Sequence, residues 1–229
     1  MSIPTLTRVE ADDFTLVHED DHLLVLDKPA GLLCVPGRGE DKQDCLSARV
    51  QRRWPDALVV HRLDMATSGL VLMARGAEMQ RRLSEAFAGR QVWKRYEAIV
   101  DGIADSQHWQ TIDAPLMADW PRRPLQKIDP EGKPSLTRWR TLETWPQQDA
   151  SHLLLEPHTG RSHQLRVHLA SIGHTILGDA LYGDARVQAR AARLLLHATV
   201  LQLRHPATGQ AMRFERPAPF GQEDVRGCP

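Results

Sequence analysis

The chain has 229 residues, of which 41% are hydrophobic, so it is long enough to bury a full core as one large domain or two small ones. Its 29 basic and 29 acidic residues give a net charge of zero, which argues mildly against nucleic-acid binding, because that function usually shows as a basic excess. The sequence has no window of about 18 apolar residues and no basic-then-apolar N-terminal segment, so we expect neither a helical membrane span nor a secretory signal.

Charged residues and cysteines are distributed unevenly. Residues 9–27 contain acids but no Lys or Arg, residues 186–204 contain Arg but no acid, and residues 81–95 are mainly basic among their charged residues. A zero net charge can therefore hide a basic face. The three cysteines are widely spaced, which fits a reduced cytoplasmic protein better than a disulfide scaffold.

The first part of the chain predicts short strands and two helices. Pro and Gly end the apolar segments, and apolar residues at three- and four-residue spacing indicate the helices. Asp44 is expected to cap the first helix with its carboxylate. The predicted strands are 14–18, 23–26, 58–60, 69–75 and 91–100, and the predicted helices are 45–54 and 77–87.

The remainder predicts loops and short strands over 101–134, then strands around one amphipathic helix at 161–172. Leu165, Leu169 and Ile172 form the buried stripe of this helix, and Gly173 ends it. Further strands are predicted at 135–144, 153–156, 194–203 and 210–215, the last two paired. Strands outnumber helices, so the expected class is α+β, with a large mixed, mostly antiparallel sheet and flanking helices.

The segment His61-Arg62-Leu63-Asp64 places charge directly before an apolar strand. The Asp64 carboxylate can act as a nucleophile at a sugar carbon or as a general base. Arg62 points the same way in an extended loop, where it can keep Asp64 ionised or contact a phosphate. Taken alone, an Arg-x-Asp of this kind is more often a surface salt bridge.

A second constellation is the predicted helix that carries Arg166. Arg166 lies at the edge of the buried side, where a cation needs a carboxylate partner, and Asp64 is the functional candidate. The alternative is a solvated helix residue. His163 shares the face of Arg166, and the helix N-terminus with Arg161 could hold a phosphate.

Tyr96 lies on a basic strand, where an aromatic ring could stack on a nucleobase, although a core tyrosine is the more common outcome. A metal site is poorly supported, because His163 and His168 are five residues apart and no Cys-x-x-Cys occurs. The sequence also lacks a serine-hydrolase elbow, a P-loop and a dinucleotide fingerprint.

Five motifs in this order resemble those of the RluA-type pseudouridine synthases, and the likeness covers about residues 14–220. They are Lys28-Pro29-Ala30-Gly31-Leu32, His61-Arg62-Leu63-Asp64 with Thr67-Ser68-Gly69-Leu70, Tyr96-Glu97-Ala98-Ile99-Val100, Gly160-Arg161-Ser162-His163-Gln164-Leu165-Arg166-Val167-His168 with Gly178-Asp179, and Leu194-Leu195-Leu196-His197-Ala198. Asp119-Trp120-Pro121 and the residues that follow it also resemble the family.

The resemblance implies a cofactor-free isomerisation of uridine to pseudouridine in RNA, on stem-loops of 23S rRNA and tRNA. It implies an α+β pseudouridine synthase fold with a central active-site cleft, formed by one catalytic domain over residues 1–229, without an S4 domain. We expect a cytoplasmic monomer that binds no metal and no membrane.

The resemblance also implies residue roles. Asp64 would attack the ribose C1′ or assist glycosidic cleavage, Arg166 would hold Asp64, and Tyr96 would stack on the target base. Arg62 would fill the space left by a base flipped out of its stem or hold its phosphate. The remaining substrate-binding candidates are His61, Thr67, Leu196, Arg161 and His163, with Leu196 as the apolar packing residue.

Three alternatives remain at the level of sequence. The chain could be a non-catalytic RNA-binding module that uses the same basic face. It could be a nucleosidase or glycosidase, although most glycosidases need two cooperating carboxylates and one convincing candidate is visible. It could also be a related synthase with a different uridine target.

Overall fold

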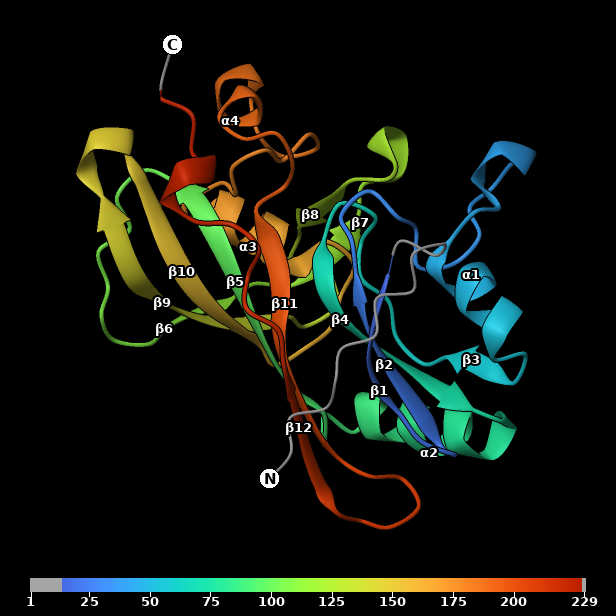
Figure 1. Cartoon of the computed structure of the whole chain (residues 1–229). Helices are drawn as coiled ribbons and strands as arrows, with labels where there is room; N and C mark the ends of the chain where they lie inside the picture. The colour runs from blue at the N-terminus through green and yellow to red at the C-terminus, as the bar shows by residue number, and fades with distance from the viewer. Residues whose placement is uncertain (1–13, 228–229) are drawn as a thin grey trace. The chain divides into compact units, whose positions relative to one another are not determined.

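The computed structural model describes residues 14–227 of the chain (Figure 1). The chain forms two compact units: unit 1 consists of Met1–Trp93 and Ala198–Arg216, and unit 2 of Lys94–His197 and Pro217–Pro229. The start of the acidic segment and Cys228 lie outside the described residues, whereas Cys34 and Cys45 are buried free thiols.

Unit 1 is built on a sheet with the strand order β1-β2-β4-β11, in which β3 also pairs with β4 and β12 pairs with β11. Strand β2 is antiparallel to both β1 and β4. The predicted pairing of the last two strands is confirmed as the antiparallel pair of β11 and β12. The elements are β1 (Thr15–Glu19), β2 (Leu23–Lys28), η1 (Glu40–Lys42), α1 (Leu46–Arg53), β3 (Ala57–Val59), β4 (Ser68–Arg75), α2 (Ala77–Ala88), β11 (Leu196–Arg204) and β12 (Ala211–Glu215).

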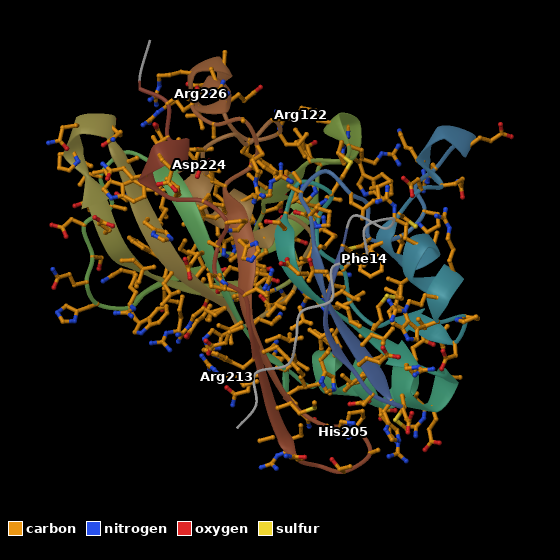
Figure 2. All side chains as sticks on the ribbon, in the orientation of Figure 1. Phe14, Arg122, His205, Arg213, Asp224 and Arg226 are labelled. Carbon is orange, nitrogen blue, oxygen red and sulfur yellow. The ribbon has the colours of Figure 1, made fainter. Side chains whose placement is uncertain are left out.

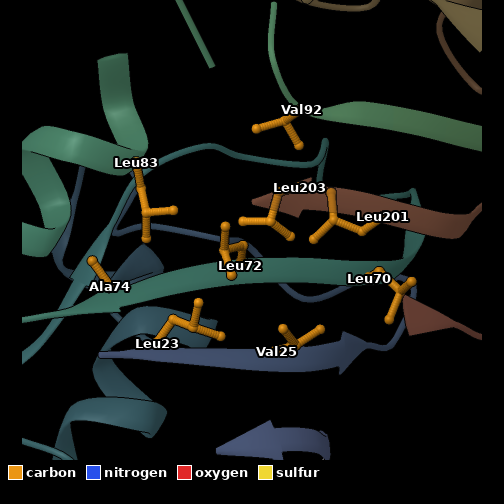
Figure 3. Close-up of a cluster of buried hydrophobic side chains, with 9 residues drawn as sticks. All are labelled: Leu23, Val25, Leu70, Leu72, Ala74, Leu83, Val92, Leu201 and Leu203. Atoms are coloured by element: carbon orange, nitrogen blue, oxygen red, sulfur yellow. The ribbon is translucent and has the colours of Figure 1, made fainter. Parts of the chain in front are cut away.

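The core of unit 1 surrounds β4, as the apolar segment after Asp64 predicts. Figure 3 shows Leu72 in the middle of this cluster, between Leu23 and Val25 of β2 and Leu203 of β11. Leu83 adds the apolar stripe of α2 to the same cluster. A fully buried leucine contributes about 1.5–3 kcal/mol, so these contacts hold the strand that follows the candidate catalytic loop.

The predicted N-cap at Asp44 is wrong. Helix α1 begins after Cys45, whose side chain makes no capping hydrogen bond. The Asp44 carboxylate instead accepts hydrogen bonds from the Arg49 guanidinium, at 2.8 and 2.6 Å. A charged partner one turn away competes with the backbone N–H groups for this exposed carboxylate.

Unit 2 contains four strands in the order β5-β10-β9-β6, and all the neighbouring pairs are antiparallel. A separate hairpin is formed by β7 and β8. The elements are β5 (Trp93–Asp101), β6 (Gln110–Asp113), β7 (Leu116–Ala118), η2 (Trp120–Arg122), β8 (Gln126–Ile128), β9 (Leu136–Trp145), η3 (Pro146–Gln148), β10 (Ala150–Pro157), α3 (Gln164–Ser171), α4 (Ala185–Ala189) and η4 (Gln222–Asp224).

Helix α3 begins three residues later than predicted. His163 has φ 55°, a left-handed conformation that an α-helix cannot include, so the helix starts at Gln164. The buried side chain of Gln164 accepts the Arg161 N–H at 3.1 Å and so satisfies one donor at this end. The predicted stop at Gly173 is confirmed by its φ of 84°, but Ile172 is exposed rather than part of the buried stripe.

The α+β class predicted from the sequence is confirmed by these elements, and all the pairings given above are antiparallel. Among the described residues, no helix combines the length and the apolar character that crossing a membrane requires.

The buried His168 of α3 makes the stability of the protein depend on pH. Its Nε2–H donates to the Ala114 carbonyl at 3.0 Å, and its Nδ1 accepts the Thr137 hydroxyl at 2.9 Å. Burial lowers the pKa of His168 below its usual 6.5, because desolvation disfavours the charged ring.

Below pH 6.5 and above the lowered pKa, the unfolded chain binds more protons than the folded chain, so stability falls as the pH falls. We expect His168→Gln to flatten this dependence in urea unfolding curves measured between pH 5 and pH 7, about the range in which histidine titrates. The exposed His158 serves as control. An unchanged slope in His168→Gln, or an equal flattening in His158→Gln, would contradict this assignment.

Candidate active site

The loop that carries Asp64 is a tight turn in unit 1. The Thr67 N–H donates to the Asp64 carbonyl at 3.1 Å, and the Thr67 side chain is buried. Asp64 is half-buried, whereas its neighbours Arg62 and Met65 are exposed. The turn therefore presents one partly shielded carboxylate beside an accessible guanidinium.

The motif Lys28-Pro29-Ala30-Gly31-Leu32 fixes this loop through hydrogen bonds to its backbone. The fully buried Lys28 ammonium donates to the carbonyls of Pro29, Leu32 and Met65, at 2.7, 2.8 and 3.1 Å. The Gly31 N–H donates to the same Met65 carbonyl at 2.8 Å, from a backbone with φ 86° that favours glycine. The Lys28 motif therefore fixes the residue that follows Asp64, a role that the sequence did not reveal.

Two further contacts fix the loop before Asp64. The Leu63 N–H donates to the Cys34 sulfur at 3.2 Å, and burial raises the pKa of the Cys34 thiol, which favours its neutral form. His61 stacks on Phe87 with 4.4 Å between ring centroids, and its Nε2 accepts the Leu72 N–H at 2.9 Å. These contacts give His61 a structural role in addition to the predicted substrate contact.

Gly69, the second residue of β4, lies at a point of close backbone approach. It has φ 109°, and a Cβ there would lie 2.4 Å from the Ala198 oxygen and 2.5 Å from the Ala198 nitrogen. We expect Gly69→Ala to lower the free energy of unfolding by about 1–3 kcal/mol or more, because backbone atoms cannot yield as a flexible side chain can. Chemical denaturation measures this loss.

Gly76 provides the matched control for this substitution. It has φ 76°, but a Cβ at that position would have no atom within 4 Å. Gly76→Ala therefore reports conformational strain alone, and its destabilisation should be the smaller of the two. Equal losses would show that the approach of Ala198 is unimportant.

In unit 2, Arg166 forms a buried bidentate ion pair with Asp179. Arg166 Nε and Nη2 lie 2.8 and 2.6 Å from the two carboxylate oxygens, and the side chains are 4% and 0% exposed. The alternative that Arg166 is a solvated helix residue is therefore wrong. The sequence missed the role of Asp179, although Gly178-Asp179 stood within the recognised motif.

Tyr182 connects this ion pair to the β7–β8 hairpin. Its hydroxyl accepts the Gln126 N–H at 2.9 Å and forms a second hydrogen bond of 2.7 Å with His163 Nδ1. The Arg166 guanidinium carbon lies 5.2 Å from the centre of the Tyr182 ring. His163 is thus held by Tyr182 rather than by the regular face of a helix.

Tyr96 is half-buried in β5, opposite Leu155 of β10. Lys94 shares its face of the strand because side chains alternate, and burial lowers the pKa of the Lys94 ammonium. Gly160 faces the same lysine, whose Nζ would lie 3.6 Å from a Cβ on that glycine. Leu196 is buried at the start of β11.

Arg161 is exposed, and its Nε donates to the Pro134 carbonyl at 3.4 Å. Its position before α3 keeps the predicted phosphate contact accessible. The basic segments seen in the sequence are partly neutralised by acids from the same helix or from elsewhere in the chain. These pairs are Arg81 with Glu85, Arg82 with Glu78, and both Arg186 and Arg190 with Asp101.

Asp20, His22 and His205 form a group with the composition of a metal site, since their potential ligand atoms lie within 4.8 Å of one another. Their hydrogen bonds favour a different role. His205 Nδ1 accepts the N–H groups of Ala207 and Thr208, which leaves the ring hydrogen on Nε2, 3.3 Å from the Asp20 carboxylate. A metal-binding histidine normally donates a hydrogen bond from its other ring nitrogen, whereas both ring nitrogens of His205 already have hydrogen-bond partners in the protein. These residues therefore form a hydrogen-bonded cluster rather than a metal site.

Comparison with known proteins identifies the family of this chain. A family model described as RNA pseudouridylate synthase matches residues 22–171. The chain belongs to this family. Dual-specificity RNA pseudouridine synthase RluA of Escherichia coli (strain K12) is 46% identical over 206 residues, which are 90% of this chain and 93% of that protein. The Yersinia pestis protein of the same name is 43% identical, with 99% of its length covered.

A solved structure supports the same fold. Human RNA Pseudouridylate Synthase Domain Containing 1 is 26% identical, with a TM-score of 0.77 over 97% of this chain and 92% of that one. The predictions of family, fold class and enzyme are therefore confirmed: the protein is an RNA pseudouridine synthase, an isomerase of uridine in RNA. The alternatives of a non-catalytic RNA-binding module and of a nucleosidase or glycosidase are therefore wrong.

The predicted site residues divide between the two units. Unit 1 carries His61, Arg62, Asp64 and Thr67, and unit 2 carries the remaining candidates, which are Tyr96, Arg161, His163, Arg166 and Leu196. The pairing of Asp64 with Arg166 joins residues of different units and stays a prediction, as do the assigned roles.

Proposed function

We propose that this synthase modifies uridines in two RNA classes, 23S rRNA and tRNA stem-loops, and that its two units act as one catalytic domain. The observation that carries the proposal is the 46% identity, over 90% of the chain, to a relative described as having dual specificity for RNA. Five ordered motifs within the described residues support the same substrate class.

The proposed reaction is an isomerisation that needs no oxidant or reductant. The N1–C1′ glycosidic bond of uridine breaks, a C5–C1′ bond forms, the C5 proton leaves and N1 takes up a proton. The half-buried Asp64 carboxylate either attacks C1′ or assists bond cleavage and removes a sugar proton. The turn held by Lys28 and Thr67 supports both routes, because it limits the movement of Asp64.

We propose that Arg166 orients and stabilises the ionised Asp64. Its guanidinium is already held in one plane by Asp179, so it can offer a second, fixed donor edge. Tyr96 stacks on the uracil and assists removal of the C5 proton, and Leu196 provides the apolar wall of the base pocket.

The remaining candidates contact the rest of the nucleotide. The exposed Arg62 fills the space left by the flipped base or holds its phosphate. Arg161 binds a neighbouring phosphate, and His163 contacts the nucleotide through Nε2, because Tyr182 occupies its Nδ1. His61 and Thr67 act chiefly by shaping the Asp64 loop.

Release of tritium from RNA labelled at uracil C5 tests this proposal, because the C5 hydrogen must leave when pseudouridine forms. We expect release from both a tRNA anticodon stem-loop and a 23S rRNA fragment, with no free uracil. Release from neither RNA would contradict the proposed substrates, whereas release from one would reduce the dual specificity to a single target.

We also propose that the enzyme works as a cytoplasmic monomer without a cofactor. Sedimentation of the protein with and without stem-loop RNA measures its oligomeric state. A dimer that persists at the enzyme concentrations of the tritium assay would contradict the proposed monomer.

A further inference from the structure

Trp120 is an exposed aromatic residue on the short η2 segment between β7 and β8. All six tryptophans lie within residues 14–227, and Trp120 is the exposed one, at 65% of its surface. Arg122, which marks this segment in Figure 2, is exposed two residues later. A single exposed apolar residue is ordinary on a protein surface, so a role for Trp120 must be argued from the groups around it.

The backbone around Trp120 is tightly bonded. The Asp119 N–H donates to the Leu125 carbonyl at 2.9 Å, and the Leu125 N–H donates to the Arg122 carbonyl at 3.0 Å. The buried Asp119 carboxylate also accepts hydrogen bonds from Arg122, including one of 2.8 Å from Nε. The segment therefore presents Trp120 from a defined position rather than from a loose loop.

One side of the Trp120 ring already carries a cation. The Arg123 guanidinium carbon lies 4.4 Å from the ring centre, and its Nε donates to the Trp120 carbonyl at 3.2 Å. Although Arg123 covers one face, 65% of the Trp120 residue is still exposed to solvent. An arginine stacked on one face of an indole leaves the other face available to a second flat group.

Among the described residues, Arg123 differs from the other basic residues of this hairpin in its lack of an acidic partner. Arg122 is paired with Asp119, and Lys127 with Asp129, the latter at 2.6 Å. No carboxylate forms an ion pair with Arg123 within the part of the chain that the structure describes. The segment therefore carries a net positive charge beside its open aromatic face.

We propose that Trp120 and Arg123 form a stacking site for an unpaired nucleobase of the substrate RNA, with Arg123 also facing the adjacent phosphate. A flat, sequence-tolerant aromatic surface next to an unneutralised guanidinium has the chemistry that single-stranded RNA recognises. The inference rests on the proposed function, because it assumes RNA as the substrate.

The hairpin is also connected to the candidate active site of unit 2. The Gln126 N–H donates to the Tyr182 hydroxyl, which in turn bonds His163. A base stacked on Trp120 would therefore lie on a hairpin that is hydrogen-bonded, through the Tyr182 hydroxyl, to the segment before α3.

Acrylamide quenching of tryptophan fluorescence tests the binding step alone. We expect the wild-type enzyme to contain an easily quenched tryptophan that stem-loop RNA protects, and Trp120→Phe to lose this component. Absence of protection in the wild type at RNA concentrations that saturate binding would overturn the inference. This measurement needs no catalysis, so it is separate from the outcome of the tritium assay.

Steady-state tritium release tests the contribution to catalysis. We expect Trp120→Ala to raise KM for the stem-loop about tenfold with a much smaller change in kcat, as loss of one stacked base predicts, and Trp120→Phe to recover most of the loss. The exposed Leu142 of unit 2, at 43% exposure, supplies the control Leu142→Ala. An unchanged KM in Trp120→Ala, or an equal rise in Leu142→Ala, would overturn the inference. Trp120 would then be a candidate for contact with another protein instead of RNA.

Discussion

Asp64→Asn is expected to lower the rate of pseudouridine formation by about 10³-fold or more, with little change in RNA affinity. Asparagine keeps the shape of the side chain but is neither a nucleophile nor a base at neutral pH. The loop should remain in place, because its contacts to Lys28, Gly31 and Thr67 use backbone carbonyls rather than the Asp64 side chain. Tritium release and RNA binding by the same preparation separate the two effects.

Asp56→Asn is the matched control for this substitution. Asp56 lies in the same unit, and its carboxylate pairs with Arg75 at 3.1 Å near the surface. A surface pair of this kind contributes about 0–1 kcal/mol, so activity should remain near that of the wild type. Substantial activity in Asp64→Asn would remove Asp64 from the chemistry and reopen the search for the catalytic group.

Asp179→Asn is expected to lower the free energy of unfolding by about 3–5 kcal/mol, because it leaves the Arg166 guanidinium buried without its counter-ion. The Asp179 carboxylate also accepts the N–H groups of Leu181 and Tyr182, at 2.9 and 3.1 Å, and the amide preserves at most part of this network. Activity should fall as well, since Arg166 would lose its fixed orientation. Denaturant unfolding and tritium release measure the two losses.

Two variants distinguish loss of the pair from general damage. Asp105 is exposed in the same unit, so Asp105→Asn should change stability by less than about 0.5 kcal/mol. The double variant Arg166→Met with Asp179→Leu removes both charges and should recover much of the stability but none of the activity. If Asp179→Asn is as stable and as active as the wild type, the proposed support of Arg166 by Asp179 is wrong.

Local pattern was sufficient to predict most of the fold. Strand β4 and helix α2 lie within one residue of their predicted limits, because a continuous apolar run and a regular apolar stripe leave few alternatives. The start of α3 was not predictable in this way. It depends on a positive φ at His163, and a non-glycine residue gives no sign in the sequence that it will adopt one.

The supporting contacts of the site were the least predictable part. Asp64 and Arg166 stood in recognisable motifs, but the partner of Arg166 is thirteen residues away, and charge patterns alone offered several acids. The basic segments were also overestimated, because Arg190 pairs with Asp101, 89 residues earlier in the chain. Long-range ion pairs follow from tertiary packing, which local sequence does not encode.

The Lys28 ammonium, fully buried among three carbonyl oxygens, has a consequence for protein engineering. Two of those carbonyls belong to its own motif, and the third belongs to Met65, in the turn that follows Asp64. A loop from another synthase that is grafted over residues 61–67 would therefore need a compatible 28–32 segment, even though the two are distant in sequence. Because these hydrogen bonds join the two segments, residues 28–32 and 61–67 should be varied together in directed evolution.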